Sequence, residues 1–425
     1  MQQGRKIVKT RTALAILAMS FAVTLSKESF SAEPIPAELV NVWTGAGERA
    51  ALKVLADDYD AAGGKFVNVP VPGSDSVMSM TVNRIIGGRP PTASQFPFSR
   101  IFDDLLRKGQ LADIDDVAKA EGWVNVLPKA ILDGIMFDGK VYLAPVNITS
   151  MNRLYYNIPL LKKAGIEKPP TALDEEFFAD LDKLKVINVI PLALGGDARQ
   201  YRWTWDSVMA GVGGKEHWQA VWVQRDPKAM KGEVQRKVFE TFRRLRNYVD
   251  KGSSGRAWNA TTNLVISGQA GMQILGDWGK AEFEAAGQKS GVDFGCGLSG
   301  SIFVLTGDVL AFPKQKNIED EKGQKLLAKV MMAQQTQLDF NVKKGSIPPR
   351  TDVSVVGNPR FDDCTQIAAK IYNKSVDVVG NSALLISADE MGSVVDLVSE
   401  YFNSPDMKTD EALERFATIL TKQKK

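Results

Sequence analysis

Short apolar runs alternate with amphipathic segments along most of the chain. The runs 37–44, 65–71 and 189–196 have the length and composition of β-strands. Residues 47–62 repeat alanine and leucine at helical spacing, and residues 74–88 begin with serine and aspartate and end at glycine. This alternation predicts an α/β protein with mostly parallel sheets that helices cover on both faces.

Later segments continue the pattern. Residues 199–214 and 234–252 are predicted helices, the second strongly amphipathic, and the apolar runs within 140–157 are expected to form paired strands. No tandem repeat, low-complexity tract or polar linker divides the chain. We therefore expect two lobes that the chain crosses between more than once, with a ligand cleft between them at the carboxyl ends of strands.

The N-terminal segment differs from the rest. Four basic residues and no acid precede Thr12, and residues 12–25 are an uncharged apolar run of 14 residues. Small residues at Ser29, Ser31 and Ala32 follow, which is the pattern of a cleavable signal peptide over residues 1–31 and of export to the periplasm. A membrane anchor is the alternative, although the run is short for a membrane span.

Removing that segment changes the charge. The whole chain carries +3, residues 1–31 contribute +4, and the remainder is near −1. Because there is no basic field, we expect no nucleic-acid partner, and no later apolar run approaches 18 residues, so we expect no membrane insertion after cleavage. The two cysteines, Cys296 and Cys364, are expected to form a disulfide in an exported protein; two buried free thiols are the alternative.

Signatures of catalysis are mostly missing from the sequence. His217 is the only histidine, so a histidine-based metal site or a Ser-His-Asp triad is not expected, and no cofactor motif is present. A glycoside hydrolase that uses two carboxylates remains open, because such pairs assemble only in the folded chain. The eight tryptophans are more informative. Four of them stand among glycine, acid and amide residues, in "VWTGAGE", "YRWTWDS", "GRAWNATTN" and "LGDWGKAEF", a mixture that favours a carbohydrate cleft over a strand core.

These segments, together with "GGRPPTASQF", "FDGKVYLAPVNI" and "KKGSIPPRTDV", resemble the extracellular solute-binding proteins of ABC sugar importers, in the glucose/mannose-binding group. The resemblance covers nearly the whole chain after the leader. It implies the type II periplasmic-binding-protein fold, with two α/β lobes, three crossovers and a central cleft. The implied lobe boundaries are 32–147 and 302–340 for the first lobe, and 148–301 and 341–425 for the second.

The resemblance also implies a set of ligand-binding residues. They are Trp43, Glu48, Gln95, Asn147, Trp258, Asn259, Asp277, Trp278, Thr306, Asp308 and Lys344. The resemblance also implies a cysteine pair, which relatives place at the positions of Cys296 and Cys364. The first strand has Val42 before Trp43 where the family has two tryptophans, and "FPFSR" follows the "PTASQ" turn where a basic residue or histidine is usual.

These departures favour a larger glycoside, or a saccharide with an apolar aglycone, over glucose. We expect Trp43 to be half-exposed above the ligand, with burial in the core as the alternative. The implied function is delivery of a mono- or disaccharide or glycoside to an ABC permease by a monomeric, non-catalytic protein. A partner that presents the sugar to a chemoreceptor is the further alternative.

Overall fold

The computed structural model describes Met1 and residues 33–374 and 377–422. The predicted signal peptide and its cleavage site lie outside the described residues. Residues Pro34–Lys425 form one compact unit. None of the described helices is long and apolar enough to cross a membrane.

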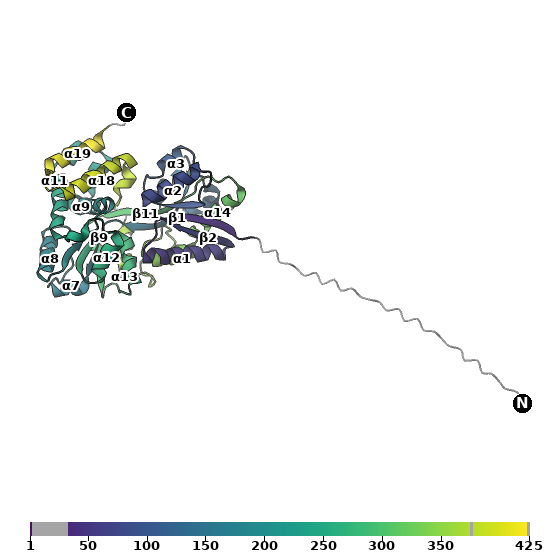
Figure 1. Cartoon of the computed structure of the whole chain (residues 1–425), viewed down its shortest axis with the longest axis horizontal. Helices are drawn as coiled ribbons and strands as arrows, with labels where there is room; N and C mark the ends of the chain where they lie inside the picture. The colour runs from purple at the N-terminus through teal and green to yellow at the C-terminus, as the bar shows by residue number, and fades with distance from the viewer. Residues whose placement is uncertain (2–32, 375–376, 423–425) are drawn as a thin grey trace. The chain divides into compact units, whose positions relative to one another are not determined.

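The larger of two main sheets has six strands in the order β12-β11-β3-β1-β2, and β6 also pairs with β11. Their bounds are β1 Ile35–Asn41, β2 Gly64–Pro70, β3 Ala93–Pro97, β6 Leu143–Ser150, β11 Phe303–Ala311 and β12 Val378–Gly380. β1 is parallel to β2 and β3, whereas β11 is antiparallel to β3 and β6. Figure 1 shows this sheet in the right-hand part of the molecule.

The smaller sheet has the order β10-β7-β9-β8. It consists of β7 Arg153–Asn157, β8 Ile190–Ala193, β9 Ala270–Leu275 and β10 Phe294–Leu298, and only the β8–β9 pair is parallel. A separate two-stranded ribbon joins β4 Met136–Phe137 to β5 Lys140–Val141. The two sheets make the protein two-lobed, as the sequence predicts.

Two predictions about the strands are wrong. The sheets are mixed and not mostly parallel, because β11 enters the larger sheet from the other lobe and so escapes the parallel βαβ geometry. The strands within 140–157 do not pair with each other: β6 pairs with β11 and β7 with β9 and β10. Only Met151 and Asn152 separate β6 from β7, so the chain changes sheets there.

Helices cover both sheets. Around the larger sheet lie α1 Ala46–Ala61, α2 Ser74–Ile86, α3 Asp103–Arg107, α4 Asp115–Ala120, α5 Trp123–Val126, α6 Lys129–Ile135, α14 Ile318–Met332 and α15 Gln334–Lys344. The remaining helices are α7 Ile158–Lys163, α8 Glu175–Val186, α9 Ala198–Trp218, α10 Pro227–Lys231, α11 Glu233–Leu245, α12 Trp258–Ile266, α13 Lys280–Ala285, α16 Asp363–Asn373, α17 Ser382–Leu385, α18 Ala388–Asn403 and α19 Thr409–Thr421.

Aromatic packing joins the helices of the second lobe. The Trp205 ring of α9 lies 4.3 Å from Phe239 of α11 and 6.0 Å from Phe416 of α19, measured between ring centroids. These buried rings hold α9, α11 and α19 together. The predicted lobe boundaries remain a prediction: within 341–425, β12 pairs with β11 of the larger sheet, while α18 and α19 pack with α9 and α11.

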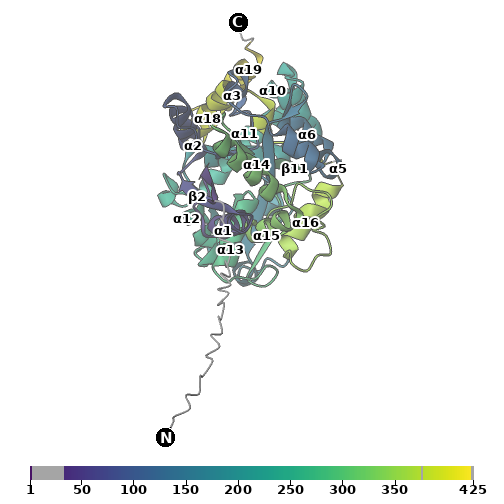
Figure 2. The ribbon, with the colours of Figure 1, turned by 90° about the vertical axis from the view of Figure 1, so that its right-hand side faces the viewer.

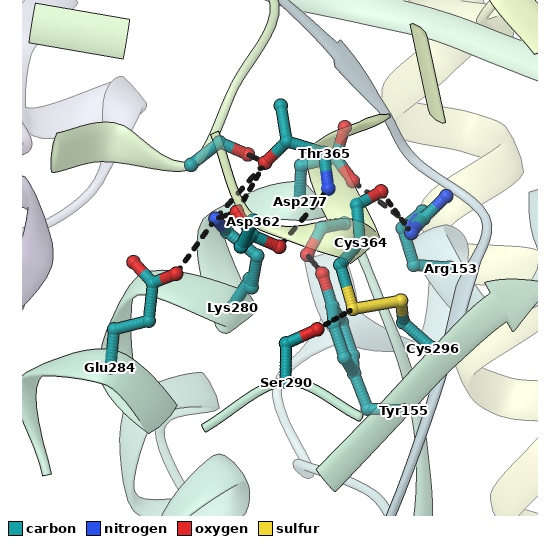
Figure 3. The surroundings of a disulfide bond; sticks show 12 residues. Arg153, Tyr155, Asp277, Lys280, Glu284, Ser290, Cys296, Asp362, Cys364 and Thr365 are labelled. Atoms are coloured by element: carbon teal, nitrogen blue, oxygen red, sulfur yellow. Dashed lines mark hydrogen bonds and ion pairs between the residues drawn. A yellow bond between two sulfur atoms is a disulfide. The ribbon is translucent and has the colours of Figure 1, made fainter. Parts of the chain in front are cut away.

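The predicted disulfide is confirmed. Cys296 of β10 bonds to Cys364 of α16, with 5.8 Å between the Cα atoms. Figure 3 shows the bond beside buried charged groups. We call Arg153, Asp277, Lys280 and Asp362 the buried ion cluster. It lies next to the disulfide, since the Arg153 guanidinium donates to the Cys364 carbonyl at 3.0 Å.

Candidate functional site

A cavity of about 630 Å³ brings together residues that are far apart in sequence. The ends of β1 and β3, the middle of β11 and the N-terminal turns of α2, α9 and α12 line it, together with α18. Its volume suits a small organic ligand. Nine of the predicted binding residues line this cavity: Trp43, Glu48, Gln95, Trp258, Asn259, Trp278, Thr306, Asp308 and Lys344.

Asp308 is the central acid of the cavity wall. Its carboxylate accepts hydrogen bonds from the amide groups of Gln95 at 2.7 Å and Asn147 at 3.0 Å. Burial raises the pKa of Asp308, and the positive charge of Lys344 opposes that shift. Gln95 also accepts the Val42 backbone N–H at 3.1 Å, so its amide is fixed in orientation. The carboxylate is thus held in place before any ligand binds.

Glu48 and Lys344 form a second polar group in the wall. The Lys344 ammonium lies 2.8 Å from one Glu48 oxygen, and both side chains are buried. The other Glu48 oxygen accepts the backbone N–H groups of Thr44 and Gly45 at the start of α1. An acid at this position of a helix satisfies N–H groups that have no partner within the helix. The pair therefore joins the start of α1 to the end of α15.

Three tryptophans present half-buried rings to the cavity: Trp203 at the start of α9, Trp258 at the start of α12 and Trp278 after β9. The rings of Trp203 and Trp278 meet edge to face, 5.1 Å apart. Such a ring offers one apolar face to a ligand while its edge is fixed by neighbours. The sequence predicts Trp258 and Trp278 as binding residues but not Trp203, although "YRWTWDS" is one of the four tryptophan segments that favour a carbohydrate cleft.

The expectation that Trp43 is half-exposed is wrong. The side chain is 1% exposed and contacts Phe340, with the ring centroids 5.5 Å apart. The ring contributes to the cavity wall but is otherwise part of the larger core. The neighbouring glycines that suggested exposure instead let α1 approach the second lobe closely.

Two predicted binding residues do not line the cavity. Asn147 lies behind Asp308 and orients it: its side-chain oxygen accepts the Asp308 backbone N–H at 2.8 Å. Asp277 is 4% exposed and belongs to the buried ion cluster (Figure 3). One of its oxygens lies 3.1 Å from Arg153, and the other accepts the Ser150 backbone N–H at 2.7 Å. Burial raises the pKa of Asp277, and the charge of Arg153 opposes this.

Part of the wall is apolar. Phe98, Ile101, Met151, Met391 and Val395 line the cavity from both lobes. The phenylalanine comes from the "FPFSR" segment that departs from the family pattern, and Met391 and Val395 lie on α18, which sequence reasoning did not connect with the site. Spacing within α18 gives no signal for such a role, because its apolar face also covers α9.

The two lobes touch beside the cavity. The Gly47 backbone N–H near the start of α1 donates to the Glu282 carboxylate of α13 at 3.2 Å. A Cβ atom on Gly47 would lie 2.1 Å from the Cβ of Ala281, so this approach requires glycine. Figure 2 shows α13 beside α1 at this contact.

Comparisons with known proteins agree with this arrangement. The family model described as bacterial extracellular solute-binding protein matches residues 44–327. A probable sugar-binding periplasmic protein of Rhizobium meliloti is 34% identical over 417 residues, which is 95% of this chain and 97% of that protein. A protein of the same description from Mesorhizobium japonicum is 33% identical over 411 residues, covering 94% of this chain and 96% of the other.

Solved structures share the fold. A chitin oligosaccharide binding protein superposes with a TM-score of 0.78 at 17% identity, over 92% of this chain and 99% of that one. A maltose-bound MalE3 of T. maritima gives a TM-score of 0.74 at 14% identity, over 91% and 98%. The two-lobed architecture, the cavity and the sequence match over most of the chain lead to one assignment: the chain belongs to the family of bacterial extracellular solute-binding proteins.

Proposed function

We propose that the protein is the periplasmic sugar-binding component of an ABC importer and delivers its ligand to the permease without chemical change. One observation carries the proposal: half-buried Trp258 and Trp278 share a cavity with the fixed carboxylate of Asp308 and the ammonium of Lys344. Aromatic faces stack on sugar rings, while charged groups form strong hydrogen bonds to sugar hydroxyls. The names of the relatives, probable sugar-binding periplasmic proteins, support it.

The predicted lobe boundaries and signal peptide complete this proposal. A ligand that contacts both lobes stabilises the closed arrangement only through the contacts it gains there, and the permease then recognises the closed form. The assignment to the glucose/mannose group and the monomeric state belong to the proposal as well. Asp277 and Asn147 are left out of the proposed direct contacts, because Asp277 is bound to Arg153 and Asn147 to Asp308.

The apolar part of the wall supports a ligand larger than a single neutral sugar. The apolar side chains of Phe98, Met151 and Met391 cannot form strong hydrogen bonds to a ligand. Strong hydrogen-bonding groups on the cavity wall come from Asp308, Lys344 and Asn259. A glycoside or disaccharide would place its hydroxyl-rich ring near the polar groups and a less polar substituent against the phenylalanine and methionines.

The proposal is tested by thermal unfolding of the mature protein with mono- and disaccharides and glycosides. A ligand at 100 times its Kd is expected to stabilise the protein by about 2.7 kcal/mol, seen as a raised Tm. Trp278→Ala is expected to lower the affinity at least tenfold, about 1.4 kcal/mol, because a stacking face is lost. Trp278→Phe, which keeps a ring, serves as the matched control. No shift with any sugar would overturn the proposal, and release of a cleaved product would favour the hydrolase.

Closing the lobes is expected to depend on Gly47. Gly47→Val places a side chain where Ala281 now lies, so the lobes cannot approach as closely and the affinity for the sugar found above is expected to fall at least tenfold. Isothermal titration calorimetry measures the effect. Ala50→Val is the control, since Ala50 is exposed on the same helix. Equal affinities of the two variants would contradict the role of this contact.

A further inference from the structure

One stretch of the cavity wall is formed by the first turns of α9 and α2. Arg199 and Arg202 of α9 lie there with Gly73 and Ser74 at the start of α2. We call these four residues the arginine wall. The two terminal nitrogens of Arg199 each lie 3.1 Å from the position that a Cβ on Gly73 would take. The guanidinium therefore packs directly against the backbone at the start of α2.

The start of α2 offers free backbone donors, beside the negative charge of Asp75 in its first turn. Gly73 precedes the helix with a φ of 87° and offers no side chain to cap it. The N–H groups of Ser76 and Val77 donate to the Gly73 carbonyl, whereas those of Ser74 and Asp75 have no acceptor among the described residues. Free N–H groups at a helix N-terminus favour an anion.

Arg199 differs from the other cations that line the cavity. Lys344 is paired with Glu48 at 2.8 Å, Arg202 with Asp206 at 2.7 Å, and Arg100 with Asp103 at 2.6 Å. Within residues 33–374 and 377–422, the Arg199 side chain forms neither an ion pair nor a hydrogen bond. It is thus the one cavity-lining cation of the described chain that no protein acid neutralises.

Arg202 lies in the same wall, but Asp206 balances its charge. It is 8% exposed, and only one terminal nitrogen bonds to Asp206 and Ser382. Burial lowers the pKa of Arg202, Asp206 opposes the shift, and the positive charge of Arg199 lowers the pKa further. The two positive charges thus act on each other, and of the two only Arg199 lacks an acid partner among the described residues.

Among the described residues, the acids that line the cavity do not neutralise Arg199. Asp197 is used at the start of α9, where it accepts the Gln200 backbone N–H at 2.9 Å and the Gln200 side-chain amide at 2.8 Å. Asp75 and Asp396 are exposed, and neither forms an ion pair with Arg199.

From this arrangement we infer that the ligand is an acidic carbohydrate whose anionic group binds in the cavity beside Arg199 and the first N–H groups of α2. The inference rests on the proposed function and narrows its substrate class. A planar guanidinium can form two parallel hydrogen bonds to a carboxylate or phosphate, and the helix N-terminus supplies further donors. The shared chemistry is an anionic oxygen group on a sugar, either the carboxylate of a uronate or the phosphate of a sugar phosphate.

Isothermal titration calorimetry on the mature protein tests the inference with matched pairs. The probes are D-glucuronate against D-glucose, D-galacturonate against D-galactose, and D-glucose 6-phosphate against D-glucose. We expect at least one acidic sugar to bind ten or more times as tightly as its neutral counterpart, with a ratio that falls as salt is added. Tighter binding of a uronate would identify a carboxylate as the anionic group, and tighter binding of glucose 6-phosphate would identify a phosphate.

Variants locate the effect. Arg199→Gln is expected to reduce the acidic-to-neutral ratio to within about threefold of unity. Folding should be retained, because the side chain has no protein partner to lose. Arg107→Gln removes a charge from an exposed arginine outside the cavity and is expected to keep the ratio. A neutral sugar that binds as tightly as its acid would overturn this inference but leave the proposed function standing. A ratio that survives Arg199→Gln would overturn the assigned site. No binding of any of these probes would overturn this inference, whereas the proposed function would fall only if the disaccharides and glycosides tested above also failed to bind.

Discussion

Asp277→Leu is expected to lower the free energy of unfolding by about 3–5 kcal/mol, because it leaves the guanidinium of Arg153 buried without a carboxylate. Arg153 is 1% exposed, and its nearest acid contact is Asp277 at 3.1 Å. The Ser150 N–H loses its acceptor in the same variant. Urea unfolding followed by circular dichroism measures the change.

A second substitution separates the charge from the packing. Arg153→Met combined with Asp277→Leu removes both charges and is expected to cost less than Asp277→Leu alone, since no unpaired charge stays buried. Asp133→Ala is the control, because Asp133 and Lys129 form an exposed pair that is worth at most about 1 kcal/mol. A double variant less stable than the single one would contradict this account of the buried ion cluster.

Removing the disulfide is expected to lower the free energy of unfolding by about 4 kcal/mol, because the bond closes a long loop in the unfolded chain. The two cysteines are 68 residues apart. The double variant with Cys296→Ser and Cys364→Ser, compared with the wild type in urea, measures this effect. Adding dithiothreitol should destabilise the wild type by a similar amount and leave the variant unchanged. A variant as stable as the oxidised wild type would contradict the prediction.

The sequence predicts the elements near the first strand well. The helices expected at 47–62 and 74–88 are observed at Ala46–Ala61 and Ser74–Ile86, because spacing and end signals within each segment determine a helix locally. Strand partners are different. Whether β6 pairs with β7 or with β11 depends on residues more than 150 positions away, and no local pattern contains that information.

The binding site, too, could be predicted only where local sequence carries the information. Residues in recognisable segments, such as Trp278 and Asp308, were assigned and do line the cavity. Asp277 stands next to Trp278 in sequence, yet its side chain points to Arg153, because neighbouring residues outside a regular strand need not face the same way. Arg199 was not assigned, because its distinguishing property is the lack of an acid partner, which only the folded chain reveals.

The order of strands in the larger sheet has a consequence for how the chain folds. β3 pairs with β11, and Gln95 and Asp308 of these strands are 213 positions apart. β1, β2 and β3 come early in the chain, but the sheet stays incomplete until β11 and then β12, at Val378–Gly380, have been synthesised. Chains with such distant pairings fold slowly, because long loops must close before the contacts stabilise them. If the chain is exported as proposed, slow formation of this sheet is expected to leave time for its translocation before the fold is complete.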